Sequence, residues 1–182
     1  MPRYIAFLRA INVGGHTVKM DQLRTLFEQL KFSNVETFIA SGNVIFDSPA
    51  TQVQQIEQQI ERHLRAALGY AVATFIRSTA QLAAVAAYQP FPPAELAQEG
   101  SSLYIAFLQA APGDTAAQKL LAFRTEVDDF HIHGREAYWL CRIRSSDSTF
   151  SGALLEKSIG MPATMRNVTT VRKLAAKYPI AQ

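Results

Sequence analysis

The sequence contains a single cysteine, Cys141, which excludes an internal disulfide and a zinc site built from cysteine pairs. It also lacks long apolar runs, since a stretch such as 104–108 is far too short to span a bilayer. The first residues lack the charged start, apolar middle and cleavage site of a signal peptide. We therefore expect a cytoplasmic protein with no membrane partner, and we expect the Cys141 thiol, inside an apolar run, to be buried and inert.

Charged residues are scarce as well, at 18% of the chain against 48% hydrophobic residues, a balance typical of globular proteins rather than disordered ones. Acidic residues are missing from both ends: residues 1–20 hold three basic residues and residues 161–182 hold four. If the ends meet in space, they form a positive field on a mildly acidic body. Ordinary solvated lysines and arginines explain the same pattern equally well.

Apolar periodicity predicts the order βαββαβ in the first half, which is the ferredoxin-like arrangement. We expect strands at residues 4–9, 35–40, 44–48 and 71–77 and helices at 20–31 and 53–64. The Ser-Gly-Asn segment at 41–43 joins two strand-like runs and has the composition of a hairpin turn.

The pattern restarts after the proline-rich segment 90–93, where a helix cannot continue. Residues 104–108 repeat residues 4–8, Tyr-Ile-Ala-Phe-Leu, letter for letter. Strand propensity alone favours such residues, but the order of elements agrees over most of the chain as well, which favours duplication. Helices are expected at 80–89, 115–124, 150–157 and 168–178, and strands at 129–133 and 137–143.

The predicted fold class is therefore α+β, with two ferredoxin-like (βαββα) subdomains from an internal duplication. We assign residues 1–77 to the first subdomain, 78–100 to a helical connector, and 101–182 to the second subdomain with a C-terminal helix.

The two halves differ in the connection between their first strand and first helix. In the first half this connection is ten residues long and includes Asn12, Gly14, Gly15 and Lys19, whereas the second half has only 110–114. Long connections inside compact domains are often functional. The glycine pair could present backbone N–H groups to an anion, or could simply supply the positive φ angles of a turn. It matches neither the P-loop nor the dinucleotide fingerprint.

A second candidate lies before the last helix. Asn167 suits an N-cap position, which is a structural role. Arg166 at the same helix start, with Arg172 and Lys173 one turn further in, gives an electropositive alternative.

Other chemical signatures are absent. His131 and His133 alternate on a strand, so they share one face as in metal sites, but no third ligand is evident and we expect no metal. Asp128 and Asp129 have no partner at a spacing that suits acid–base catalysis, and no serine or cysteine triad or RNA-recognition signature is present. The sequence assigns no reaction, so enzyme status stays open, and it indicates no cofactor.

Several segments together resemble the signature of a bacterial domain-of-unknown-function family, number sixteen ninety-seven. They are RAINVGG at 9–15, Met20 with Leu23, SGNVIF at 41–46, LLEK at 154–157 and TMRNVTT at 164–170. The resemblance runs from residue 3 to residue 178. It implies two ferredoxin-like subdomains and no established activity. The chain departs from the family pattern at Ala10 and Lys31, where glycines are usual, and at Val168, where tryptophan is usual.

These observations predict a binding protein for an anionic small molecule, phosphate- or nucleotide-like. The candidate ligand-binding residues are Arg9, Asn12, Gly14, Gly15, Lys19, Ser41, Asn43, Arg166 and Asn167; all but Lys19 are also positions of the family signature, as is Gly42.

Two alternatives remain open. One is weak, non-specific binding of nucleic acid by the basic ends of the chain. The other is a structural or protein-interaction module without a ligand, in which Arg9, Asn43 and Arg166 are buried polar groups. Burial separates these hypotheses, because pocket residues should be partly exposed and structural residues inaccessible. The sequence sets neither the ligand nor the oligomeric state.

Overall fold

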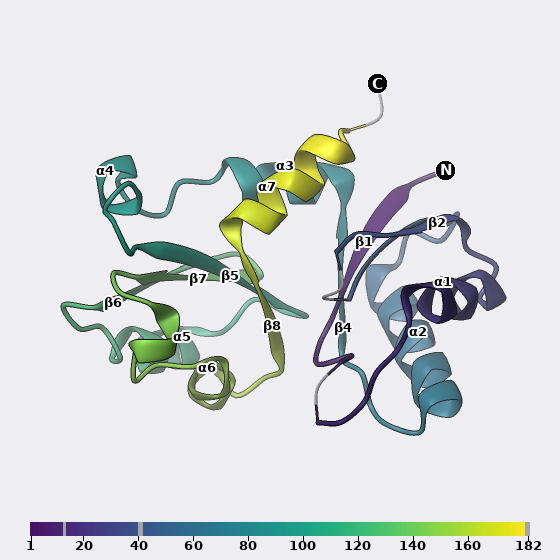
Figure 1. Ribbon diagram of the computed structural model, residues 1–182, viewed down its shortest axis with the longest axis horizontal. Coiled ribbons are helices and arrows are strands. Elements are labelled where there is room, and N and C mark those ends of the chain that lie inside the picture. Colours follow the sequence, from purple (N-terminus) through teal and green to yellow (C-terminus); the bar gives the residue numbers. More distant parts are fainter. Residues whose placement is uncertain (13, 40–41, 181–182) are drawn as a thin grey trace. The chain divides into compact units, whose positions relative to one another are not determined.

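The computed structural model describes residues 1–12, 14–39 and 42–180. Its strands are β1 (Arg3–Leu8), β2 (Ser33–Thr37), β3 (Asn43–Asp47), β4 (Thr74–Ser78), β5 (Ser102–Leu108), β6 (Asp128–His133), β7 (Glu136–Cys141) and β8 (Ala163–Asn167) (Figure 1). Its helices are α1 (Met20–Gln29), α2 (Val53–Leu68), α3 (Thr79–Ala87), α4 (Pro93–Leu96), α5 (Asp114–Leu121), α6 (Gly152–Ile159) and α7 (Val168–Lys177).

The strands form two four-stranded antiparallel sheets, ordered β2-β3-β1-β4 and β6-β7-β5-β8. Each sheet therefore has its first strand in the centre between its third and fourth strands, which is the ferredoxin-like order. The predicted α+β fold with two similar ferredoxin-like subdomains is confirmed.

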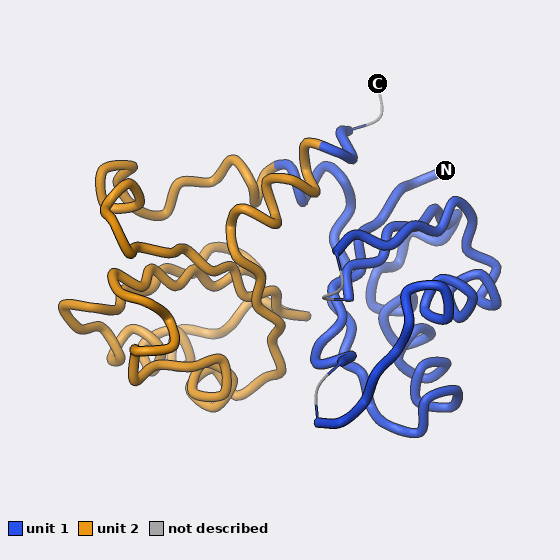
Figure 2. The backbone as a smooth tube through the Cα atoms, in the orientation of Figure 1, with its two compact units in different colours: residues 1–83, 177–182 blue, residues 84–176 orange. Residues whose placement is uncertain are grey.

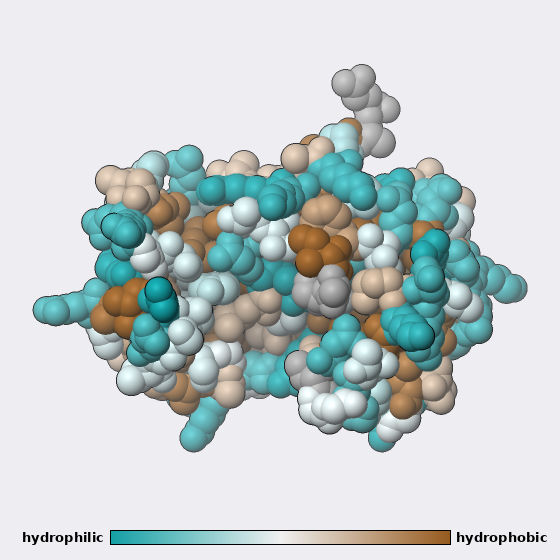
Figure 3. Space-filling model, viewed as in Figure 1, coloured by the Kyte–Doolittle hydropathy of each residue, from teal (hydrophilic) through white to brown (hydrophobic). Residues whose placement is uncertain are grey.

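The chain divides into two compact units, residues 1–83 with those from Lys177 onward, and residues 84–176 (Figure 2). In the first unit, one face of the sheet packs against α1 and α2 through alternating apolar residues. Tyr4, Ala6 and Leu8 of β1 lie in this core with Phe27 of α1 and Ile60 of α2. On the face shown in Figure 3, hydrophilic residues surround small apolar patches in both units.

The repeated Tyr-Ile-Ala-Phe-Leu segment forms the central strand of each sheet, in the same register. Ile5 of β1 faces Arg77 of β4, and Ile105 of β5 faces Arg166 of β8. Arg77 is thus the counterpart of Arg166, and β8 is the counterpart of β4.

Sequence patterns missed β8, because its five residues, Ala-Thr-Met-Arg-Asn, form no apolar or alternating run. The strand is set instead by its pairing with β5, a case of tertiary context overriding propensity. The strand expected at 35–40 also differs, since β2 runs from Ser33 to Thr37 with an irregularity in its pairing to β3 between Ser33 and Glu36.

No helix among residues 1–12, 14–39 and 42–180 is both long and apolar enough to cross a membrane.

Candidate functional site

The loop after β1 and the turn before β3 lie side by side in the first unit, because Phe7 pairs with Asn43 and the Leu8 amide donates to the Gly42 carbonyl at 2.9 Å. Gly42 has φ +77° and lies so close to Ile11 that a Cβ there would meet the Ile11 Cγ2 at 2.8 Å. Asn43 is fully buried, and its side-chain amide donates to the Phe38 carbonyl at 2.9 Å. Gly42 and Asn43 therefore have a structural role where the loop leaves β1.

The loop itself is fixed by polar contacts to its own backbone. The Asn12 side-chain oxygen accepts from the Val18 amide at 2.7 Å, and the Tyr70 hydroxyl donates to the Ile11 carbonyl at 2.9 Å. The ring of His16 stacks on Tyr70 with centroids 3.9 Å apart. These contacts tie Ile11, Asn12 and His16 of the loop to Val18 and Tyr70.

The charged and glycine positions of this loop are exposed. Arg9, Gly14, Gly15 and Lys19 all face solvent, and a Cβ on either glycine would meet no atom within 4 Å. Both glycines have positive φ, at +65° and +83°, so they serve the turn as well. Ser41 lies outside the described residues.

Arg166 is buried rather than presented at a helix start. It lies on β8, and its guanidinium donates to the Thr164 hydroxyl at 2.8 Å and to the Met165 carbonyl at 2.9 Å. Burial lowers the pKa of Arg166 to about 10, which still leaves the group charged at neutral pH. Its counterpart Arg77 is buried too, and donates to the carbonyl of the preceding residue at 2.8 Å. An arginine repeated in this way at the edge of both sheets indicates a role in the fold.

Asn167 caps α7, as expected. Its side-chain oxygen accepts from the Thr169 amide at 2.9 Å. The equivalent helix of the first unit, α3, begins differently: Ser78 and Gln81 bond reciprocally to each other's backbone amides, at 3.2 and 3.0 Å, as a capping box does. Thr170 stands at the position equivalent to Gln81, so α7 lacks the second half of that box.

A polar pocket of about 300 Å³ lies at the start of α7. The pairing of Tyr104 with Asn167 explains its position, because the residues before Tyr104 then run beside those after Asn167. Its lining consists of small polar residues, a few aliphatic ones and one arginine: Leu96, Ser101, Ser102, Leu103, Asn167, Val168, Thr169 and Arg172. Every one of these residues belongs to the second unit.

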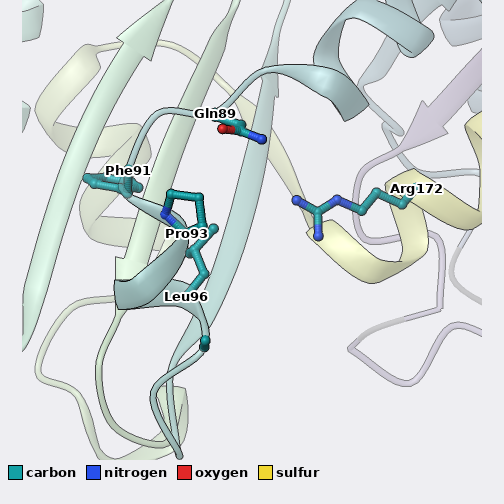
Figure 4. Close-up of a pocket in the computed structure, with 6 residues that line it drawn as sticks. Gln89, Phe91, Pro93, Leu96 and Arg172 are labelled. Carbon is teal, nitrogen blue, oxygen red and sulfur yellow. The ribbon is translucent and has the colours of Figure 1, made fainter.

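A second pocket of about 300 Å³ shares Leu96 and Arg172 with the first and has a more apolar lining. Gln89, Phe91, Pro93 and Ala97 complete it. In Figure 4 the Arg172 side chain extends from α7 toward Gln89, Pro93 and Leu96. The two pockets therefore adjoin, and Arg172 lines both of them.

The electrostatics of this region favour an anion. Arg172 is the one charged residue among the described residues that line either pocket, and it forms no ion pair with any described residue. Glu95, next to the shared Leu96, is paired with Arg142 at 2.5 Å, so its negative charge is compensated. The Ser101 hydroxyl is buried and finds no hydrogen-bond partner within the described chain. The first turn of a helix adds N–H groups without intrahelical acceptors and the positive end of the helix dipole.

The acid-free ends of the chain do meet in the first unit, but around a carboxylate. Arg3 and Lys177 both pair with Glu36, at 2.5 and 3.8 Å, and the Tyr178 hydroxyl donates to the same carboxylate at 2.9 Å. Burial alone would raise the pKa of Glu36, but the hydrogen bonds and positive charges from these neighbours lower it below its usual value. The positive field expected from the two ends is thereby partly neutralised.

The two histidines of β6 contact an aromatic residue. His131 Nε2 lies 2.7 Å from the Tyr88 hydroxyl, and His133 stacks on the Tyr88 ring with centroids 4.0 Å apart. No group of three or more histidine, cysteine or carboxylate side chains able to hold a metal occurs in the described part of the chain. Cys141 is buried, as expected, and burial raises the pKa of its thiol.

The family described as "Protein of unknown function (DUF1697)" matches residues 1–138, which include β1, its loop and the SGNVIF segment. The chain belongs to this family. Among solved structures it is similar to the conserved bacterial protein SP0830 from Streptococcus pneumoniae, with a TM-score of 0.75 and 20% sequence identity over 97% of this chain and 98% of that one. This structural likeness supports the α+β fold with two four-stranded sheets. None of the curated proteins compared with the chain matches it.

The residues expected at one site fall in different compact units. Arg9, Asn12, Gly14, Gly15, Lys19 and Asn43 belong to the first unit, and Arg166 and Asn167 belong to the second. Their convergence on one ligand stays a prediction. Of the expected residues, Asn167 lines a pocket, while Asn43 and Arg166 are buried. Sequence reasoning did not select Ser101, Ser102 or Thr169, which carry no motif of their own.

Proposed function

We propose that the protein binds an anionic small molecule, phosphate- or nucleotide-like, at the start of α7. The observation that carries the proposal is the polar pocket there, whose single charged residue, Arg172, has no ion-pair partner among the described residues. A guanidinium with no carboxylate to neutralise it, beside the N-terminal turn of a ten-residue helix, suits a phosphate group.

Arg172 contributes most of the expected affinity in this proposal. A hydrogen bond to a charged group is worth about 1.5–3 kcal/mol, which corresponds to a factor of about 10–100 in the dissociation constant. The helix dipole adds about 0.3–1 kcal/mol. Asn167 acts as a positioning residue because it fixes the first turn of α7, and the buried Arg166 directly precedes it on β8.

Thermal unfolding in the presence of inorganic phosphate tests the proposal. Phosphate should raise the melting temperature of the wild type, and Arg172→Gln should remove the rise while leaving the unliganded melting temperature nearly unchanged, because Arg172 is exposed. Lys173→Gln is the matched control, since it removes the same charge from the next residue, which lines neither pocket. An equal loss in both variants, or no rise in the wild type, would refute an anion site at Arg172.

The loop of the first unit is a separate part of the proposal. Arg9 and Lys19 are exposed in the same loop as two glycines whose Cβ positions are open, residue types that can also receive an anion. If the loop binds phosphate as well, Arg9→Ala should reduce the phosphate-induced rise in melting temperature. An unchanged rise would restrict the site to α7.

A further inference from the structure

The polar pocket at the start of α7 adjoins a second compartment of different chemistry, the apolar compartment. Beyond the shared residues Leu96 and Arg172, the walls are made by Phe91, Pro93 and Ala97, with one amide from Gln89. An inorganic anion has no group to place against these apolar walls. A ligand that fills both compartments must carry an anionic group next to an apolar one.

We propose that the ligand is an organic phosphate with an apolar or aromatic group beside its phosphate, the class to which nucleoside monophosphates belong. This inference rests on the proposed function and narrows its ligand. The phosphate binds at the first turn of α7 beside Arg172, and the apolar group packs against Pro93 and Leu96, toward which Arg172 extends in Figure 4.

Three features of the two compartments support this class of ligand. Arg172 can bond a phosphate and at the same time lie against a flat ring, because the guanidinium is planar. The Gln89 side-chain amide adds an NH2 donor group and a carbonyl acceptor to a mostly apolar lining, a combination that suits a heterocyclic base. The compartments measure about 300 Å³ each, so that together they fall within the usual range of small-molecule sites.

Isothermal titration calorimetry with three probes tests the inference: inorganic phosphate, adenosine monophosphate and adenosine. The wild type should bind adenosine monophosphate about tenfold or more tightly than phosphate, because apolar surface is buried in addition to the charged contacts. Adenosine should bind more weakly than the monophosphate by at least a similar factor, about tenfold, since it makes no bond to Arg172.

Two substitutions, one on the short helix α4 and one at the residue directly after it, separate the compartments. Ala97 is exposed and lines only the apolar compartment, so Ala97→Trp should fill it and remove the preference for the monophosphate while leaving phosphate binding intact. Ala94 is exposed on α4 and lines neither compartment, and Ala94→Trp should preserve the preference.

The outcomes separate the inferred ligand class from the underlying proposal that the site binds an anion. Equal affinity of the wild type for phosphate and adenosine monophosphate would overturn the inference and leave the proposed function standing. A preference that survives in Ala97→Trp would overturn it too. Failure of every anion to bind would contradict both the inference and the proposed function.

Discussion

Replacing Gly42 by alanine tests how the turn before β3 supports the loop after β1. Gly42 has φ +77°, a left-handed conformation that costs a residue with a Cβ about 1–2 kcal/mol. The new Cβ would also lie 2.8 Å from the Ile11 Cγ2 and 3.1 Å from the Leu8 Cβ. Ile11 and Leu8 are both buried, so surrounding atoms limit their movement. The Leu8 Cβ is attached directly to the backbone, so it can move away from the new methyl group only if the backbone moves.

The expected loss for Gly42→Ala is therefore the conformational cost plus about 1–3 kcal/mol for overpacking. Gly15→Ala is the matched control, because its φ of +83° imposes a similar backbone cost while its Cβ would meet nothing within 4 Å. Urea denaturation followed by far-ultraviolet circular dichroism measures both variants. If Gly42→Ala is no less stable than Gly15→Ala, the close approach of the turn to the loop is wrong.

Three further predictions concern other parts of the chain. Asp128→Ala should lower stability by about 1–3 kcal/mol, because the buried indole N–H of Trp139 loses its acceptor, the Asp128 Oδ1 at 2.7 Å. Fluorescence of Trp139, the one tryptophan of the chain, measures the loss during urea denaturation, and an unchanged midpoint would contradict it. The folded-state pKa of Glu36 is lowered, so its contribution to stability is present above the unfolded pKa near 4.3 and is lost as pH falls through the folded value. Glu36→Gln should accordingly flatten the fall in melting temperature below about pH 5, and an acid limb identical to that of the wild type would count against the ion-pair cluster. Because the net charge is only +3, the protein should bind single-stranded DNA weakly and without sequence preference, with an affinity that falls as salt is added. Submicromolar, sequence-dependent binding at physiological salt would contradict this expectation.

The repeated Tyr-Ile-Ala-Phe-Leu segment made the fold predictable, because it marks the central strand of both halves. It could also have revealed β8. Alignment of the two copies places Arg77 near the end of β4 in register with Arg166, so the segment before α7 must be a strand if the duplication is complete. The local pattern gives no such signal, since this strand depends on pairing with β5 and not on its own apolar residues.

The candidate site was only partly predictable. The sequence marks Arg166 and Asn167 as unusual, but it cannot distinguish a buried arginine from an exposed one, because burial depends on what the fold places around the strand. The pocket lining comes from three separate segments, after α3, at the start of β5 and at the start of α7. Strand register brings the start of β5 beside the start of α7, but it does not place the segment after α3, and none of the small polar residues in the lining stands out in the sequence.

A titration of the isotopically labelled protein with inorganic phosphate, followed by amide chemical shifts, shows directly whether an anion binds at the start of α7. We expect saturable shifts that are largest at Val168, Thr169, Ser101 and Ser102, and that are absent in Arg172→Gln. Saturable shifts confined to other parts of the chain, or no shifts at high phosphate concentration, would contradict it.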